Sequence, residues 1–407
     1  MDKKNFQIDY RYKNTTGKEI DVWFSKPIET STQKNIEIVR NREPDTSTEY
    51  PFLNPICYYK LNPDDELKIT IRYYGTSKEH SSSGMISEEE SQFFLRSTRL
   101  IPVNESTKES ALLIIDKEKD QMQKAKKIFK HIVTHFKYST HFNERGIQSF
   151  LKKKKGDCGE FAALFASYCR SVGIPARVLY GTWTLKKFSP HSWAEVYIQG
   201  KGWVPVDPSM GRMKLFYHPF IHVTSAIFYG AMSNNDRYFG SHEGKRFAFS
   251  IEPFRDLSPV SNIDIEMNYF SQKACIDGEM IAWGYEFLDG KAPFLQPIYP
   301  RIHSPLKKTN VKLLFGSWRG KHLEWRKHLS YHIKTASFSI AFICLFIELI
   351  NDYLIKNQTL SVILPSLSIP LVLLGILFSL FRREGNAAIY IMGFFFLLAL
   401  VDPYLTR

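Results

Sequence analysis

The sequence has few of the features that mark common classes of protein. Only 5 cysteines occur in 407 residues, too few for a disulfide framework in a chain of this length. It contains no Gly-rich phosphate loop, no calcium loop of the EF-hand type and no Cys/His pattern with zinc spacing. No nucleic-acid-binding motif accompanies the formal net charge of +13. We therefore expect no metal, no cofactor and no nucleic-acid partner.

One part of the chain has very little charge. Residues 359–381 contain no Asp, Glu, Lys or Arg over 23 positions, and about 20 apolar residues suffice to cross a bilayer core. Two further apolar segments flank this one, at 335–350 and 386–401. We predict a transmembrane region of about three helices within residues 331–407. A buried helix hairpin in a soluble domain is the alternative.

The basic residues around these segments predict an orientation. They gather at positions 319–334 and again at 382–383, whereas the loop between the first two predicted spans has only Lys356. Cytoplasmic loops carry the excess of Lys and Arg, so we expect the large N-terminal body on the cytoplasmic side of the membrane. The first ten residues show no apolar segment of a secretory signal, which agrees with this orientation. The reverse topology, with the body outside the cell, is the alternative.

The pattern of apolar residues predicts an α+β fold. Residues 1–105 alternate between polar and apolar side chains and suggest a β-sandwich-like module with a polar loop at 75–90. Helical spacing over 116–138 opens a central core at 110–255, in which we expect 216–232 to form a buried loop. Residues 256–330 return to strand-like alternation and predict a β-rich extension.

The positive charge is distributed unevenly. Residues 111–260 hold 23 Lys and Arg against 12 Asp and Glu, a net charge of +11. The densest cluster of positive charge is the run of four consecutive lysines from Lys152 to Lys155, just before Cys158. Such a run is most often a solvated loop, and we interpret it so. A rim that attracts acidic substrates or anionic lipids is the alternative.

A short segment of the core presents a cysteine suited to nucleophilic chemistry. Asp157 is a good N-cap residue, and Gly173 followed by Ile174 and Pro175 marks the end of the helix that Asp157 begins. Cys158 would then lie at the helix N-terminus, where the macrodipole and free amides favour a thiolate. Cys169 falls on the apolar face and is expected to be core.

Two strands after this helix bring a histidine and an aspartate together. Residues 192–198 alternate, 199–202 form a turn, and 203–207 return. This hairpin pairs position 194 roughly with 207, so His191 and Asp207 lie near one another. Asp207 can then hold the imidazole tautomer while His191 takes the proton of Cys158, which gives a nucleophile, a base and an orienting acid.

Four motifs in this order resemble the transglutaminase-like superfamily. They are 156–162 (GDCGEFA), 173–178 (GIPARV), 191–197 (HSWAEVY) and 202–208 (GWVPVDP). The resemblance covers about residues 110–255. It implies a papain-like core in which Cys158, His191 and Asp207 are nucleophile, base and orienter, and it allows a β module before the core.

The second donor of the oxyanion hole is the part of the site that the motifs leave open. Tyr138 and Gln148 precede Cys158, and their spacing does not choose between them. We expect a membrane-anchored cysteine acyl-transfer enzyme that acts on amide bonds of proteins or peptides through a thioester, with hydrolysis favoured over cross-linking. A catalytically silent peptide-binding scaffold and a true protein-glutamine transglutaminase are the alternatives.

Overall fold

The computed structural model describes most of the chain. The described residues are 4–78, 85–140, 144–185, 189–214, 217–232, 234–260, 273–276, 279–282, 297–301, 316–384, 386–387, 389–391 and 393–394. The chain divides into two compact units, Met1–Arg212 with Asp236–Lys321 and Met213–Asn235 with His322–Arg407. The expected α+β class is confirmed.

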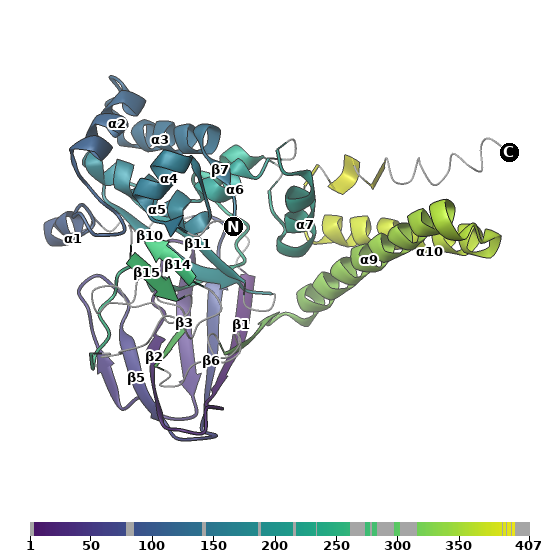
Figure 1. Cartoon of the computed structure of the whole chain (residues 1–407), viewed down its shortest axis with the longest axis horizontal. Coiled ribbons are helices and arrows are strands. Elements are labelled where there is room, and N and C mark those ends of the chain that lie inside the picture. The colour runs from purple at the N-terminus through teal and green to yellow at the C-terminus, as the bar shows by residue number, and fades with distance from the viewer. Residues whose placement is uncertain are drawn as a thin grey trace. The chain divides into compact units, whose positions relative to one another are not determined.

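The N-terminal part of the first unit is built from two four-stranded sheets (Figure 1), ordered β17-β1-β6-β3 and β16-β2-β5-β4. In β1 and β6, which pair antiparallel, every second side chain is buried, as the alternating sequence predicts. Tyr10 and Phe24, one from each sheet, bring their ring centroids to 6.3 Å. The strands are β1 (Lys4–Lys13), β2 (Ile20–Ser25), β3 (Gln33–Arg40), β4 (Thr46–Thr48), β5 (Ile56–Leu61) and β6 (Glu66–Gly75).

Strands from residues 256–330 complete sheets that begin elsewhere in the chain. β16 (Ile298–Arg301) pairs with β2, and β17 (Ser317–His322) lies beside β1. β14 (Lys273–Ile276) and β15 (Glu279–Ala282) form a hairpin that adds β8 (Glu144–Arg145) in parallel. Much of this predicted β-rich extension, including residues 263–267 and 289–290, lies outside the described residues.

In the core of the first unit, helices pack on a separate antiparallel sheet, ordered β12-β11-β10-β13. Figure 1 shows helices α2 to α5 gathered on one side of strands β10 and β11. The helices are α2 (Glu105–Ile115), α3 (Gln121–His135), α4 (Ile147–Lys153), α5 (Cys158–Ser171) and α6 (Pro208–Arg212), with a short η1 helix (Asn235–Tyr238). The strands are β10 (Ala176–Trp183), β11 (Pro190–Ile198), β12 (Gly202–Val206) and β13 (Arg246–Ile251), and β7 (Lys137–Tyr138) pairs with β9 (Lys155–Gly156).

Two helices differ from the sequence prediction at their starts. The polar loop that we expected to reach residue 90 ends at Ser87, whose side chain accepts the Glu90 N–H at 3.0 Å and caps α1 (Glu88–Phe93). The helix expected at 116–138 begins only at Gln121, because Asp116 takes a positive φ of 53° after α2 and Asp120 caps α3. Local capping therefore decides both boundaries.

The N-terminal sheets are joined to the core sheet by buried polar contacts. The Gln33 side chain pairs with the Ala248 backbone through two hydrogen bonds of 2.8 Å, donating to the carbonyl and accepting from the amide. The backbone N–H of Ser31 donates to Glu195 at 2.9 Å. Both contacts are long-range in sequence, which explains why the two parts form one compact unit.

The second unit contains α7 (Pro219–Tyr229), α9 (Trp325–Ile350), a π-helical turn at Asn351–Ile355 and α10 (Gln358–Phe381). The prediction of a buried loop at 216–232 is wrong: Pro219 opens a helix there and Gly230 ends it with a φ of 69°. The continuous helices Trp325–Ile355 and Gln358–Phe381 are long and apolar enough to cross a membrane. Most of the third predicted span, 386–401, lies outside the described residues.

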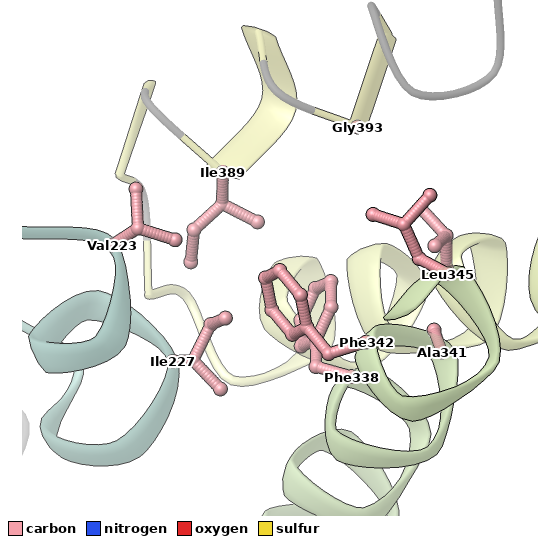
Figure 2. A pocket seen from close by; sticks show the side chains of 9 residues that line it. Val223, Ile227, Phe338, Ala341, Phe342, Leu345, Ile389 and Gly393 are labelled. Atoms are coloured by element: carbon pink, nitrogen blue, oxygen red, sulfur yellow. The ribbon is translucent and has the colours of Figure 1, made fainter. Parts of the chain in front are cut away.

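A pocket in the second unit is lined by apolar side chains from its helices (Figure 2). Its walls offer no nucleophile and no titratable group. The lining residues are Val223, Ile227, Phe338, Ala341, Phe342, Leu345, Val372, Ile389 and Gly393. The candidate site residues Cys158, His191 and Asp207 all lie in the first unit.

Candidate active site

Cys158 is the first residue of α5, and the residues around it fix the start of that helix. The Asp157 side chain accepts the Gly159 N–H at 2.8 Å, while the Glu160 carboxylate accepts the Asp157 N–H at 3.0 Å, which is a reciprocal capping box. Gly156 precedes them because a Cβ there would lie 2.7 Å from the Phe150 ring. The predicted helix and its cap are confirmed, and Cys169 is fully buried as core.

His191 and Asp207 are brought together by the predicted hairpin. Ala194 pairs with Val206, one residue from the expected register. The Nε2 atom of His191 lies 2.7 Å from Oδ2 of Asp207, and both side chains are buried. Because Nε2 contacts the carboxylate, Nδ1 is the nitrogen left to exchange a proton with a thiol. The imidazole stacks on Trp183 with a centroid distance of 5.1 Å.

Asp207 is held ionised by its neighbours. Its Oδ2 accepts from Arg246 Nη1 at 2.5 Å as well as from His191, and its Oδ1 accepts the Ser209 hydroxyl at 2.7 Å and the Met210 N–H at 3.0 Å. Burial alone would raise the pKa of this carboxyl, but the charge of Arg246, followed by that of His191, holds the pKa well below its usual range.

The surroundings of Cys158 oppose the thiolate that its helix position was expected to favour. Burial raises the pKa of the thiol, and the negative charges of Asp157, Asp207 and Glu160 raise it further. The backbone N–H of Ser192, the residue after His191, bonds the sulfur and acts in the opposite direction. Burial is the largest of these causes, and together with the neighbouring carboxylates it favours the neutral thiol over the thiolate.

The two candidate oxyanion donors are placed differently. Tyr138 pairs with Gly156 across β7 and β9, and its ring lies 6.3 Å from that of Phe161. Burial raises the pKa of the Tyr138 phenol, and the charge of Cys158 is the next cause. Gln148 is instead exposed on α4. The choice between Tyr138 and Gln148 stays a prediction.

The four lysines before Cys158 are exposed at the end of α4 and the start of β9. Lys153 forms an ion pair of 2.5 Å with Glu144, and Lys154 lies over the Phe136 ring at 4.6 Å. These contacts agree with a solvated surface run. Trp193 is buried against Phe94 and Leu179 and packs in the core.

Comparison with known proteins places this site in a family. Residues 109–208 match the model of the transglutaminase-like superfamily. This chain carries a transglutaminase-like domain. Its Cys158, His191 and Asp207 all lie within the matched residues, and this agrees with the four motifs of the sequence.

Two curated relatives of the transglutaminase-like domain are peptide-N(4)-(N-acetyl-beta-glucosaminyl)asparagine amidases. The one from Arabidopsis thaliana is 37% identical over 62 residues, 15% of this chain and 8% of that protein. The one from Oryza sativa subsp. japonica is 39% identical over 62 residues, 15% of this chain and 12% of that protein. The chain thus matches only about a tenth of the length of these relatives.

Solved structures with a similar arrangement are more distant. A candidate cysteine protease from Cytophaga hutchinsonii is 17% identical, with a TM-score of 0.40 over 51% of this chain and 78% of its own. The periplasmic domain of TgpA from Pseudomonas aeruginosa is 17% identical, with a TM-score of 0.32 over 50% of this chain and 89% of its own. At these scores the likeness adds nothing to the family match.

The first unit contains a buried charged group that the sequence motifs did not indicate. Arg246, on β13, contacts Asp207 and also donates to Glu243 from Nε at 2.9 Å and Nη2 at 3.0 Å. The Tyr238 hydroxyl donates to the same Glu243 at 2.6 Å. One signal was present, namely two charged residues at the start of an otherwise apolar strand, Lys245 and Arg246 before 247–251.

Proposed function

We propose that this protein is a membrane-anchored cysteine amidase that hydrolyses amide bonds in proteins or peptides. The observation that carries the proposal is the 2.7 Å contact between His191 Nε2 and Asp207 Oδ2. The next residue after His191 on the same strand is Ser192, whose backbone amide bonds the Cys158 sulfur. A nucleophile, a base and an orienting acid are thereby available in one buried place. Helices α9 and α10 would provide the anchor.

The first chemical step begins from a neutral thiol. As the Cys158 sulfur attacks the amide carbonyl, His191 accepts the thiol proton at Nδ1, so that charge separates only when the substrate is present. Asp207 holds the ring through Nε2 and stabilises the imidazolium that forms. The backbone N–H at the start of α5 and the Tyr138 phenol are the proposed donors to the oxyanion.

Attack of the sulfur gives a tetrahedral intermediate, which collapses in the second part of the cycle. The imidazolium gives its proton to the leaving amine, the C–N bond breaks, and a thioester remains on Cys158. A water molecule, deprotonated by His191, then attacks the thioester and releases a carboxylic acid and the free thiol. An amine in place of water would give transamidation. We favour water, in line with the amidase names of the curated relatives.

The test is turnover of an amide substrate library by the full-length protein in detergent. We expect Cys158→Ala to abolish release of amine or ammonia, while Cys169→Ala, the matched buried cysteine of the same helix, retains it. Adding a primary amine separates the acceptors: a carboxylic acid product supports hydrolysis, and an amine adduct supports a transglutaminase. Unchanged turnover in Cys158→Ala would exclude the proposed nucleophile.

A second candidate function is a silent peptide-binding scaffold at the membrane, and the raised pKa of Cys158 is the observation that favours it. Iodoacetamide labelling distinguishes the two. In an assembled triad His191 accepts the thiol proton as the sulfur attacks, so iodoacetamide labels Cys158 at a pH well below the free-thiol pKa of about 8.5, and His191→Ala slows that labelling. A scaffold labels no faster than an unactivated thiol, with or without His191.

A further inference from the structure

The buried group behind His191 consists of three charged side chains in direct contact. Arg246 lies between the carboxylates of Asp207 and Glu243, at 2.5 Å and 2.9 Å. The three side chains are at most 2% exposed. A planar guanidinium can serve two carboxylates at once, whereas a lysine would offer only a point charge. Arg246 is therefore suited to fix both acids in one geometry.

Each member of this group is charged. Burial opposes ionisation of Glu243, but Arg246 lowers the pKa of that carboxyl, and Asp207 is held ionised by the same cation. Burial likewise opposes the charge of Arg246, but the two carboxylates raise its pKa. Two negative charges and one positive charge leave a net charge of −1 next to His191. Protonation of His191 brings the group to zero.

Other titratable groups surround these three side chains. Burial and the charge of Arg246 lower the pKa of His242 to about 3, so His242 is neutral. The Gly244 N–H donates to its Nδ1 at 2.9 Å, which agrees with the neutral form. The groups that face this region from other elements are Lys4, which bonds the Glu243 carbonyl, Tyr238 on η1, Tyr180 on β10, Tyr138 on β7, and Asp157, Cys158 and Glu160 at the start of α5.

We propose that Glu243 is a positioning residue of the active site, which supplies through Arg246 the negative charge that lets His191 take the Cys158 proton. Without the charge of Glu243, the positive charge of Arg246 would neutralise the negative charge of Asp207, and His191 would lie beside a pair with no net charge. The orienting acid would then lose its electrostatic effect while keeping its hydrogen bond. The proposal rests on the proposed roles of Cys158 and His191.

This charge balance makes opposite predictions for the two partners. Glu243→Gln raises the local net charge from −1 to 0, so His191 accepts the Cys158 proton less readily when the sulfur attacks. Arg246→Gln lowers the local net charge to −2 and acts in the other direction. The double variant returns to −1. A merely structural role predicts loss in every one of these variants.

The experiment measures the rate of Cys158 alkylation by iodoacetamide in the full-length protein, by mass spectrometry, across pH 5 to 9. We expect Glu243→Gln to slow alkylation at pH 7 about tenfold, the change that one pKa unit represents. Arg246→Gln should not slow alkylation, and the double variant should return to within about threefold of the wild type. Glu243→Asp and Arg246→Lys keep the charges and serve as controls, even if Arg246→Gln fails to fold.

Two outcomes would overturn the proposal. One is alkylation in Glu243→Gln at the wild-type rate at every pH, and the other is equal slowing in Glu243→Gln and in the charge-conserving Glu243→Asp. Turnover measured in parallel separates this inference from the proposed function. If turnover requires Cys158 but the alkylation rate does not depend on Glu243, the role of Glu243 is rejected and the amidase stands. If the alkylation rate follows the charge at Glu243 and Arg246 but no turnover is found, only the amidase is rejected.

Discussion

Replacing Asp207 by Asn tests the role of the orienting acid while preserving its shape. In the wild type Oδ2 accepts from His191 and Arg246, and Oδ1 accepts from Ser209 and Met210. An amide has only one oxygen, so its NH2 group must face donors at one of these two positions. If the NH2 group faces His191, the imidazole turns or changes tautomer, and Nδ1 no longer accepts the Cys158 proton.

The expected loss is large for activity and moderate for stability. A wrong tautomer in a triad lowers turnover by about 10⁴-fold, equivalent to about 5 kcal/mol at 1.36 kcal/mol per decade. A buried donor left without its acceptor costs about 1–3 kcal/mol of folding free energy. The assay is amide turnover and urea unfolding of the full-length protein in detergent, with Ser209→Ala as the control that keeps the carboxylate.

The same substitution changes how stability depends on pH. Folding lowers the pKa of Asp207, so its contribution is fully present above the unfolded pKa of about 3.9 and is lost as the pH falls toward the folded value. We therefore expect the stability difference between wild type and Asp207→Asn to shrink below about pH 4. Turnover in Asp207→Asn within tenfold of the wild type would refute this account of His191.

Three further predictions concern the oxyanion donor, the sheet beneath the site and the membrane. We expect Tyr138→Phe to lower kcat by about 10- to 10³-fold with little change in KM, since one oxyanion donor is lost, whereas Gln148→Ala should have no effect; steady-state kinetics will compare them. Gly181→Ala should destabilise the protein by about 1–3 kcal/mol in urea unfolding, because a Cβ there would lie 2.2 Å from the Phe247 carbonyl oxygen. An unchanged free energy of unfolding in Gly181→Ala would contradict this packing. In intact cells the body should be protected from added protease, and cleavage would reverse the predicted orientation.

Local patterns in the sequence were sufficient to locate the candidate site. Asp157 and Gly173 mark the ends of α5, and the hairpin around Gly200 brings His191 to Asp207, because caps and tight turns are specified by neighbouring residues. The same kinds of signal were present but misread at Ser87 and at Pro219, each of which begins a helix where we expected a loop.

Contacts between distant residues could not be predicted in the same way. Arg246 reaches Asp207 across 39 positions, and its place at the start of an apolar strand does not indicate which acid it contacts. β16 and β17 join sheets begun near the N-terminus, because strand pairing depends on the whole fold. The pKa of the Cys158 thiol is raised mainly by burial, which depends on the whole fold and could not be predicted from the residues around Cys158.

The most direct test of the central claim is to trap the acyl-enzyme. The full-length protein is mixed with a slowly hydrolysed activated peptide ester, quenched in acid and digested, and the acylated residue is identified by mass spectrometry. The account predicts a thioester on Cys158 that is absent in His191→Ala and unaffected by Cys169→Ala. An acyl group on another residue, or none on Cys158 while substrate is consumed, would contradict it.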